Sequence, residues 1–157
     1  MLETELHGEA EQLAFGESLA SALGAPGLRL LVFLEGELGA GKTTLVRGFL
    51  AGLGHRGPVR SPTYTLIEPY DVGGRRVYHL DLYRIADPDE LEFLGLRELL
   101  AEPALVLVEW PQRGAGWLPQ PDLAIRIVHL GDARRLAVEA RDGYPAEVLA
   151  RLADKLQ

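Results

Sequence analysis

The sequence contains no cysteine, and this absence removes several kinds of chemistry. Disulfides, zinc–thiolate sites, iron–sulfur clusters and a thiol nucleophile all require cysteine sulfur. No stretch reaches the roughly eighteen uncharged apolar residues of a membrane-spanning helix. The segment Met1–Glu5 is acidic and lacks the basic flank of a signal peptide. The sequence therefore predicts a cytoplasmic protein without a membrane segment.

Positive charge is also scarce in this chain. There are 23 acidic residues against 16 lysines and arginines, which gives a formal net charge of -7. A protein that binds nucleic acid by itself usually presents a basic surface to the phosphate backbone. Two basic pairs, Arg75-Arg76 and Arg134-Arg135, lie at expected hairpin turns, where solvent-exposed charge is the usual interpretation. Any connection with RNA is therefore expected to run through a partner protein.

The length and the hydrophobic pattern predict one α/β domain over residues 1–157. Of the 157 residues, 47% are hydrophobic, which suits one buried core better than two. Two continuous apolar runs, 30–34 and 104–108, predict strands that are covered on both faces of a parallel sheet. We expect a mainly parallel central sheet with antiparallel hairpin additions and helices on both faces. The other expected strands are 63–70, 75–82, 125–128 and 136–138, and the expected helices are 9–23, 43–53, 88–94, 96–100 and 145–156.

A glycine-rich segment lies between the strand at 30–34 and the helix at 43–53. Its sequence, Gly36-Glu37-Leu38-Gly39-Ala40-Gly41-Lys42-Thr43, fits the pattern G-x-x-x-x-G-K-[ST]. The glycines allow successive backbone N–H groups to face a phosphate, and the helix N-terminus adds its positive dipole. Lys42 suits the β- and γ-phosphates of ATP, and the Thr43 hydroxyl suits magnesium. The predicted nucleotide-binding residues of this P-loop are Glu37, Leu38, Gly39, Ala40, Gly41, Lys42, Thr43 and Thr44.

Two acidic residues are candidates for the metal and for catalysis. Glu109 follows the apolar strand at 104–108, and ligands of doubly wound sheets gather at the carboxyl ends of strands. Asp81 and His79 point to one side of their strand because strand side chains alternate, although an ordinary polar sheet face would show the same pattern. The sequence leaves open which acid touches the metal. The expected metal ligands are Thr43, Glu109 and Asp81, the expected catalytic residues are Lys42, Asp81 and Glu109, and the supporting candidates are His79 and Trp110.

A hydroxyl-rich loop, Ser61-Pro62-Thr63-Tyr64-Thr65, follows the expected P-loop helix. In nucleotide-dependent switches, loops of this kind often respond to the γ-phosphate. Clusters of the same composition also form ordinary turns, so the composition alone does not decide between the two. We regard Ser61, Thr63, Tyr64 and Thr65 as switch candidates.

Taken together, these blocks resemble the bacterial TsaE (YjeE) family, the ATPase component of tRNA threonylcarbamoyladenosine synthesis. The resemblance extends from about Gly16 to Ala140. The P-loop is widely shared among proteins, whereas the combination of the other blocks is distinctive. The matching blocks are Gly36–Thr44, Ser61–Leu66, His79–Arg84, Glu90–Gly95 and Val108–Pro111.

The resemblance implies an activity and partners. It implies that Lys42, Thr43, Asp81 and Glu109 serve ATP and magnesium, and that the loop from Ser61 to Thr65 acts as a switch. It also implies work with the TsaB–TsaD pair, whose TsaD subunit places a threonylcarbamoyl group on the adenosine beside the tRNA anticodon. The ATPase then resets that complex between turnovers and meets tRNA only indirectly. Family members tend to carry a threonine in the first helix that helps to hold the base, and Gln12 stands at the corresponding place here.

Three other functional classes share the P-loop. A small-molecule kinase uses the same loop but needs an acceptor pocket and usually an arginine-bearing lid, an option that Arg84 and Arg113 leave open. A GTPase is disfavoured because guanine recognition in that class resembles Asn-Lys-x-Asp, and this chain has no asparagine. The third class is a nucleotide-dependent binding module with negligible turnover.

Overall fold

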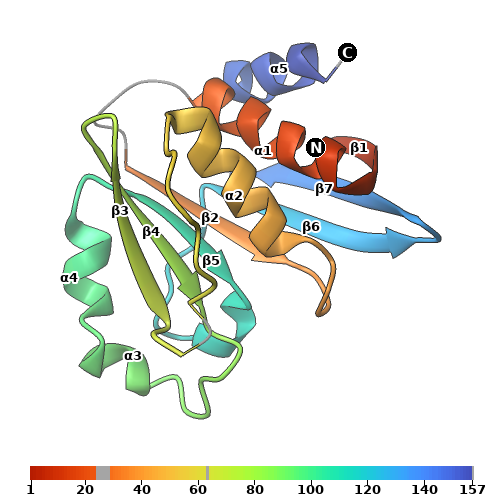
Figure 1. The fold of residues 1–157 in the computed structure, drawn as a ribbon. Coiled ribbons are helices and arrows are strands. Elements are labelled where there is room, and N and C mark those ends of the chain that lie inside the picture. Colours follow the sequence, from red (N-terminus) through yellow and green to blue (C-terminus); the bar gives the residue numbers. More distant parts are fainter. Residues whose placement is uncertain (24–28, 63, 157) are drawn as a thin grey trace.

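The computed structural model describes residues 1–23, 29–62 and 64–156. Within these ranges the chain forms one sheet of seven strands in the order β1-β7-β6-β2-β5-β4-β3 (Figure 1). The strands are β1 Leu2–His7, β2 Leu30–Glu35, β3 Ile67–Val72, β4 Arg75–Asp81, β5 Leu105–Glu109, β6 Leu123–Leu130 and β7 Ala133–Ala140. The helices are α1 Gly8–Leu23, α2 Lys42–Leu53, α3 Glu90–Phe93, α4 Leu96–Ala101, η1 Pro111–Gly114 and α5 Ala146–Lys155.

The centre of the sheet is parallel and its edges are antiparallel. Strand β2 pairs in parallel with β5 and β6, and β4 pairs in parallel with β5. The hairpins β3–β4 and β6–β7 and the pair β1–β7 are antiparallel. The predicted α/β fold with antiparallel additions is therefore confirmed, and β2 lies at the centre of the sheet. The carboxyl ends of β2, β4 and β5 consequently meet at one edge of the sheet.

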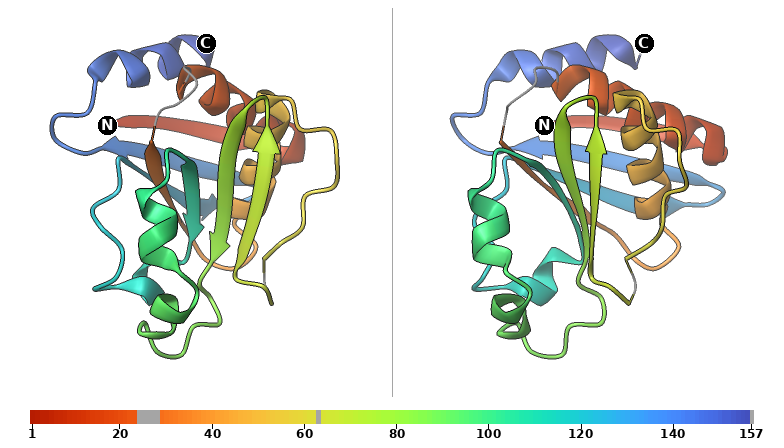
Figure 2. Two further views of the ribbon diagram at one scale, coloured as in Figure 1. Left: turned by 90° about the vertical axis from the view of Figure 1, so that its left-hand side faces the viewer. Right: turned by 60° about the vertical axis from the view of Figure 1, so that its left-hand side comes forward.

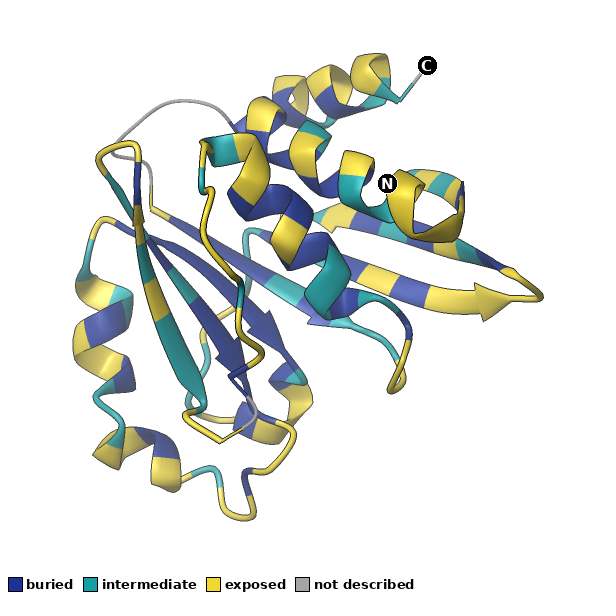
Figure 3. Ribbon diagram, viewed as in Figure 1, coloured by how far each residue is buried: buried dark blue, intermediate teal, exposed yellow. Residues whose placement is uncertain are grey.

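Helices cover both faces of the sheet, and each face has its own buried cluster. Helices α1, α2 and α5 pack on one face, whereas α3 and α4 lie against the other (Figure 1). The two views in Figure 2 also place α5 beside α1 and well apart from α3 and α4. Strand β5 is buried along its whole length, and Figure 3 shows it dark blue, because both faces are covered there.

The larger cluster joins α1 and α2 to the sheet. Phe15 of α1 and Phe49 of α2 are each 1% exposed or less. Burying a side chain of this size stabilises the fold by about 1.5–3 kcal/mol. The two helices approach closely because glycines face each other: a Cβ on Gly16 would collide with the Leu45 carbonyl, and one on Gly48 with the Leu13 carbonyl. This contact holds the helix that begins at the P-loop against the rest of the fold.

Strand β1 differs from the sequence-based expectation, which contains no strand before residue 9. Leu2, Thr4 and Leu6 alternate with exposed Glu3 and Glu5, and the strand pairs only with β7. The acidic residues are tolerated because they lie on the open face of an edge strand.

Two expected elements begin at least two residues later than the sequence predicts. Strand β3 starts at Ile67 rather than at 63, since a turn precedes it. Helix α3 starts at Glu90 rather than at Pro88. The capping pattern at Asp87 nevertheless forms, because the Asp87 N–H donates to Glu90 Oε2 and the Asp89 N–H donates to Asp87 Oδ1. The capping signal therefore marks a turn that leads into a short helix.

No helix in the described part of the chain combines the length and the apolar character of a membrane span.

Candidate phosphate-binding site

A cavity of about 460 Å³ lies where the carboxyl ends of β2, β4 and β5 meet. The register of β4 and β5 places Asp81 directly beside Glu109 at this edge. The segment after β2 supplies the glycine-rich loop and the first residues of α2. The residues that line the cavity are Leu38, Gly39, Ala40, Gly41, Lys42, Thr43, Thr44, Ser61, Asp81, Tyr83, Arg84, Glu109 and Trp110. Seven of the eight predicted nucleotide-binding residues therefore share one cavity with both acidic candidates.

The backbone of the loop has the conformation that its glycines permit. Gly39 and Gly41 have φ angles of 77° and 107°, in the left-handed region that other residues rarely adopt. A Cβ on Gly36 would lie 2.7 Å from the Ile127 carbonyl oxygen, so this glycine allows β6 to approach the loop. The loop leads directly into the N-terminus of α2, whose unpaired N–H groups favour an anion.

Lys42 lies inside the cavity, and among the described residues its ammonium contacts one backbone carbonyl and one aromatic ring. Its ammonium donates a hydrogen bond to the Gly36 carbonyl and lies 3.8 Å from the centroid of the Trp110 ring. The side chain is buried, and burial lowers its pKa, while Glu109 and Asp81 act in the opposite direction. A phosphate would supply the anionic partner that this ammonium lacks.

One oxygen of Glu109 accepts two hydrogen bonds from groups on other elements. Thr43 Oγ1 donates to Glu109 Oε2 at 3.0 Å, and His79 Nε2 lies 2.6 Å from the same oxygen. Glu109 and His79 are 3% and 0% exposed, so a buried histidine of β4 fixes the carboxylate at the end of β5. Among the described residues, Nδ1 of His79 has no hydrogen-bond partner, which indicates that its proton is carried by Nε2.

Asp81 is buried beside the other acid, in surroundings that disfavour the charged form of its carboxyl group. Burial raises the pKa of its carboxyl group, and the Glu109 carboxylate raises it further. The Tyr83 N–H, which donates to Asp81 Oδ1 at 3.0 Å, opposes this shift, as do His79 and Lys42. Burial makes the anionic form of a carboxyl group unfavourable, and a bound cation stabilises that form.

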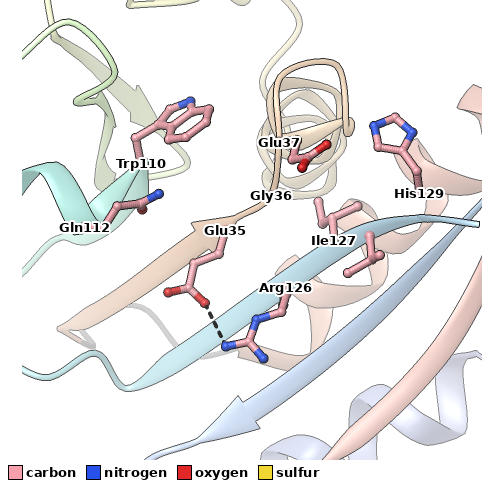
Figure 4. Close-up of a pocket in the computed structure, with 9 residues that line it drawn as sticks. Glu35, Gly36, Glu37, Trp110, Gln112, Arg126, Ile127 and His129 are labelled. Carbon is pink, nitrogen blue, oxygen red and sulfur yellow. Dashed lines mark ion pairs between the residues drawn. The ribbon is translucent and has the colours of Figure 1, made fainter.

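Trp110 separates this cavity from a neighbouring groove of about 560 Å³. Figure 4 shows Trp110 and Gln112 on one side of the groove, with Glu37 and His129 on the other. The Glu35–Arg126 ion pair, 3.6 Å long, lies along its floor. Glu37 therefore faces the groove, whereas the other predicted nucleotide-binding residues face the cavity.

Backbone strain is concentrated around the cavity. Among the described residues other than glycine, only Leu66 and Trp110 have positive φ angles, 68° and 58°. The Trp110 ring lies 4.9 Å from the Tyr83 ring between centroids, with the two planes tilted by 50°. The Leu66 carbonyl accepts a hydrogen bond from the Asp81 N–H at 3.0 Å. Such conformations persist where the surrounding contacts enforce them, and they are common at functional sites.

The switch candidates divide between the cavity and the surface. Ser61 lines the cavity, whereas Tyr64 and Thr65 are exposed and do not. Thr65 Oγ1 donates to Glu68 Oε1, and the Tyr64 ring lies under the Arg84 guanidinium. Thr63 lies outside the described residues.

Arg134 is a site residue that the sequence pattern does not predict. The expectation for the pair Arg134-Arg135 was solvent-exposed charge, which is wrong for Arg134. Its Nε donates to the Ala40 carbonyl at 3.2 Å, and its Nη2 donates to the Gly39 carbonyl at 3.5 Å. Because C=O and N–H point in opposite directions across a trans peptide, this contact directs the Gly41 N–H away from Arg134. The parallel pairing of β6 with the distant strand β2 brings the β6–β7 hairpin, and with it Arg134, beside the P-loop. Short-range sequence patterns do not report this contact.

The candidate ligand atoms suit magnesium that binds together with a nucleotide better than a metal ion that is held by protein side chains alone. The described residues contain no group of three or more His, Cys, Asp and Glu side chains able to hold a metal. The candidates offer the Thr43 hydroxyl and the carboxylates of Glu109 and Asp81, which are all oxygen donors. Magnesium usually takes one or two carboxylates together with substrate phosphates. The set therefore suits an ion that arrives with a nucleotide.

The buried strand, the glycine loop and the helix that starts at Lys42 define the class: a P-loop domain. The family model for "Threonylcarbamoyl adenosine biosynthesis protein TsaE" matches residues 6–137. The chain therefore belongs to the TsaE family, and its role lies within tRNA threonylcarbamoyladenosine biosynthesis. This confirms the resemblance that the sequence blocks indicated.

Individual relatives agree with this assignment. The chain is 43% identical to the tRNA threonylcarbamoyladenosine biosynthesis protein TsaE of Haemophilus influenzae over 90% of this chain and 91% of that protein. It is 45% identical to the Bacillus subtilis protein of the same name over 74% and 72% of the two chains. The crystal structure of YdiB from Bacillus subtilis superimposes with a TM-score of 0.80 and 32% identity, covering 99% of this chain and 96% of that one.

Proposed function

We propose that this chain is a magnesium-dependent ATPase that supports tRNA threonylcarbamoyladenosine modification by cycling a TsaB–TsaD complex. The observation that carries the proposal is the convergence of Lys42, Thr43, Asp81 and Glu109 in one cavity. These residues come from α2, β4 and β5, and the cavity includes the glycine loop. A cation, a hydroxyl and two acids at the end of a P-loop match the parts that phosphoryl transfer requires.

Each residue has a distinct part in the proposed reaction. Backbone N–H groups of the loop and the Lys42 ammonium bind the β- and γ-phosphates. Thr43 and one or both acids hold magnesium, which neutralises phosphate charge when it is bound. The second acid orients the attacking water. Glu109 is positioned for these tasks by His79, while Trp110 closes the cavity beside Lys42.

Catalysis on this proposal depends on position and charge more than on proton transfer. The oxygen of a water molecule attacks the γ-phosphorus, and the bond from that phosphorus to the bridging oxygen breaks. The bonding electron pair remains on ADP, and the water protons leave with inorganic phosphate. Turnover is expected to be slow for the chain alone and faster with its partners.

ATP hydrolysis with and without purified TsaB–TsaD and tRNA tests this proposal. We expect release of ADP and phosphate that requires magnesium and that increases when TsaB–TsaD is added. Transfer of phosphate to a small metabolite would instead support a kinase. Nucleotide binding with no turnover in any mixture would leave a binding module and contradict the ATPase.

A further inference from the structure

Arg84 is the second cation of the cavity, and no acidic residue in the described part of the chain forms an ion pair with it. Lys42 and Arg84 are the cations among the residues that line the cavity, and Asp81 and Glu109 are the acids. The lining is therefore close to neutral, whereas a triphosphate remains anionic after magnesium has bound. Lys42 compensates part of that charge. The other side chain in the lining that can compensate it is Arg84.

The guanidinium of Arg84 is held only by an aromatic ring. Among the described residues, none forms a hydrogen bond or ion pair with Arg84, whose guanidinium lies 4.9 Å from the centroid of the Tyr64 ring. Several other arginines are engaged with carboxylates, for example Arg141 with Asp122 at 2.8 Å. Tyr64 is 84% exposed, so this cation–π contact is of the weak surface kind. Arg84 can therefore leave Tyr64 at little cost when a stronger anionic partner is present.

The backbone around Arg84 joins the metal-site acid to the loop that contains Tyr64. The Tyr83 N–H donates to the Asp81 carboxylate, which fixes the turn that carries Arg84. The Asp81 N–H in turn donates to the carbonyl of Leu66, two residues after Tyr64. The segment that carries Tyr64 and the segment that carries Arg84 are therefore both hydrogen-bonded to Asp81.

We infer that Arg84 is a ligand of the terminal phosphate of ATP and exchanges the Tyr64 ring for the γ-phosphate oxygens. This inference rests on the proposed ATPase function and adds a residue to it. The planar guanidinium donates two hydrogen bonds to phosphate oxygens and stabilises the charge that develops while the γ-phosphoryl group moves to water. Arg84 transfers no proton. Loss of the γ-phosphate returns Arg84 to Tyr64 and so reports hydrolysis to the loop.

Calorimetric titration with a non-hydrolysable ATP analogue and with ADP, both with magnesium, tests the inference. Arg84→Ala is expected to weaken binding of the ATP analogue about tenfold, because charge-assisted hydrogen bonds to the γ-phosphate are lost, and to leave ADP within about twofold. Arg84→Lys should recover only part of the loss because an ammonium lacks the planar fork. The matched control is Arg113→Ala, whose guanidinium stacks on Tyr83 at 5.4 Å but does not line the cavity.

Removal of the Tyr64 ring tests separately whether Arg84 exchanges this ring for the γ-phosphate. Tyr64→Leu is expected to strengthen binding of the ATP analogue about two- to fivefold, because a surface cation–π contact of 0.5–1 kcal/mol no longer competes. Equal losses for ATP analogue and ADP in Arg84→Ala, or no loss for either, would overturn the inference while leaving the ATPase proposal intact. If the parental chain binds neither nucleotide, the ATPase proposal fails and the inference fails with it.

Discussion

Lys42 shows at the scale of one residue how the cavity is prepared for an anion. Its ammonium is buried between a carbonyl oxygen and an aromatic face and forms no salt bridge with any residue that the structure describes. We predict that Lys42→Ala weakens ATP binding by at least about tenfold, because a charge-assisted contact with phosphate is lost. Titration of ATP into the variant measures this. The matched control is Lys155→Ala, at the exposed end of α5, which should bind ATP as the parental chain does.

Glu109 should separate turnover from nucleotide binding. Glu109→Gln keeps the shape of the side chain and removes the charge that, in the proposed function, faces magnesium and the attacking water. We predict a fall in turnover of at least about tenfold, with ATP affinity changed by only a few-fold. Turnover and binding are measured on the same preparation with partners present. Hydrolysis at the parental rate would contradict the catalytic assignment of Glu109.

We predict that the Asp81 side chain lowers the stability of the nucleotide-free fold at neutral pH and supports magnesium-dependent turnover. Its pKa in the folded protein is raised above the unfolded value, so the folded state loses stability as the pH rises through the interval between the two values. At neutral pH, Asp81→Asn should therefore raise the thermal midpoint of the nucleotide-free protein and lower magnesium-dependent turnover. Scans near pH 7 and below pH 4 measure the first effect, which should shrink at the lower pH. A lower midpoint at pH 7 would contradict this account.

At the scale of secondary-structure elements, a single glycine substitution can test the close packing of α2 on α1. We predict that Gly48→Ala destabilises the fold by about 1–3 kcal/mol or more, because the new methyl group would collide with the backbone of Leu13. Chemical denaturation measures this change. The control is Gly57→Ala, whose Cβ would meet only the His55 ring at 3.4 Å and should be nearly neutral.

The same elements show which parts of the fold a sequence can predict. Strands β2 and β5 are continuous apolar runs, and α2 follows a recognisable loop, so local pattern suffices for them. Strand β1 is short, acidic on one side and stabilised by pairing with β7, a partner more than one hundred residues away. Arg134 reaches the P-loop because β6, the hairpin partner of β7, pairs with the distant strand β2. The His79–Glu109 contact also depends on register between strands, and alternation along β4 indicated only the side to which His79 points.

At the scale of the whole molecule, the loop that contains Tyr64 and the proposed phosphate site lie at one edge of the sheet. If ATP controls docking on TsaB–TsaD, the partner must bind this edge with different affinities in the different nucleotide states. A ligand shifts such an equilibrium only by its different affinity for the two states, and coupling between sites is typically about 1–3 kcal/mol. The corresponding change in partner affinity is about 5- to 150-fold.

The most direct test of ATP-driven cycling is the affinity of this chain for TsaB–TsaD in three states: with a non-hydrolysable ATP analogue, with ADP and without nucleotide. The account predicts that the ATP-analogue state differs from the other two by about 5- to 150-fold, and that Tyr64→Ala with Thr65→Ala reduces this difference. If the double variant keeps the full difference in partner affinity, the switch does not lie in this loop. Equal affinities of the parental chain in all three states would contradict the account.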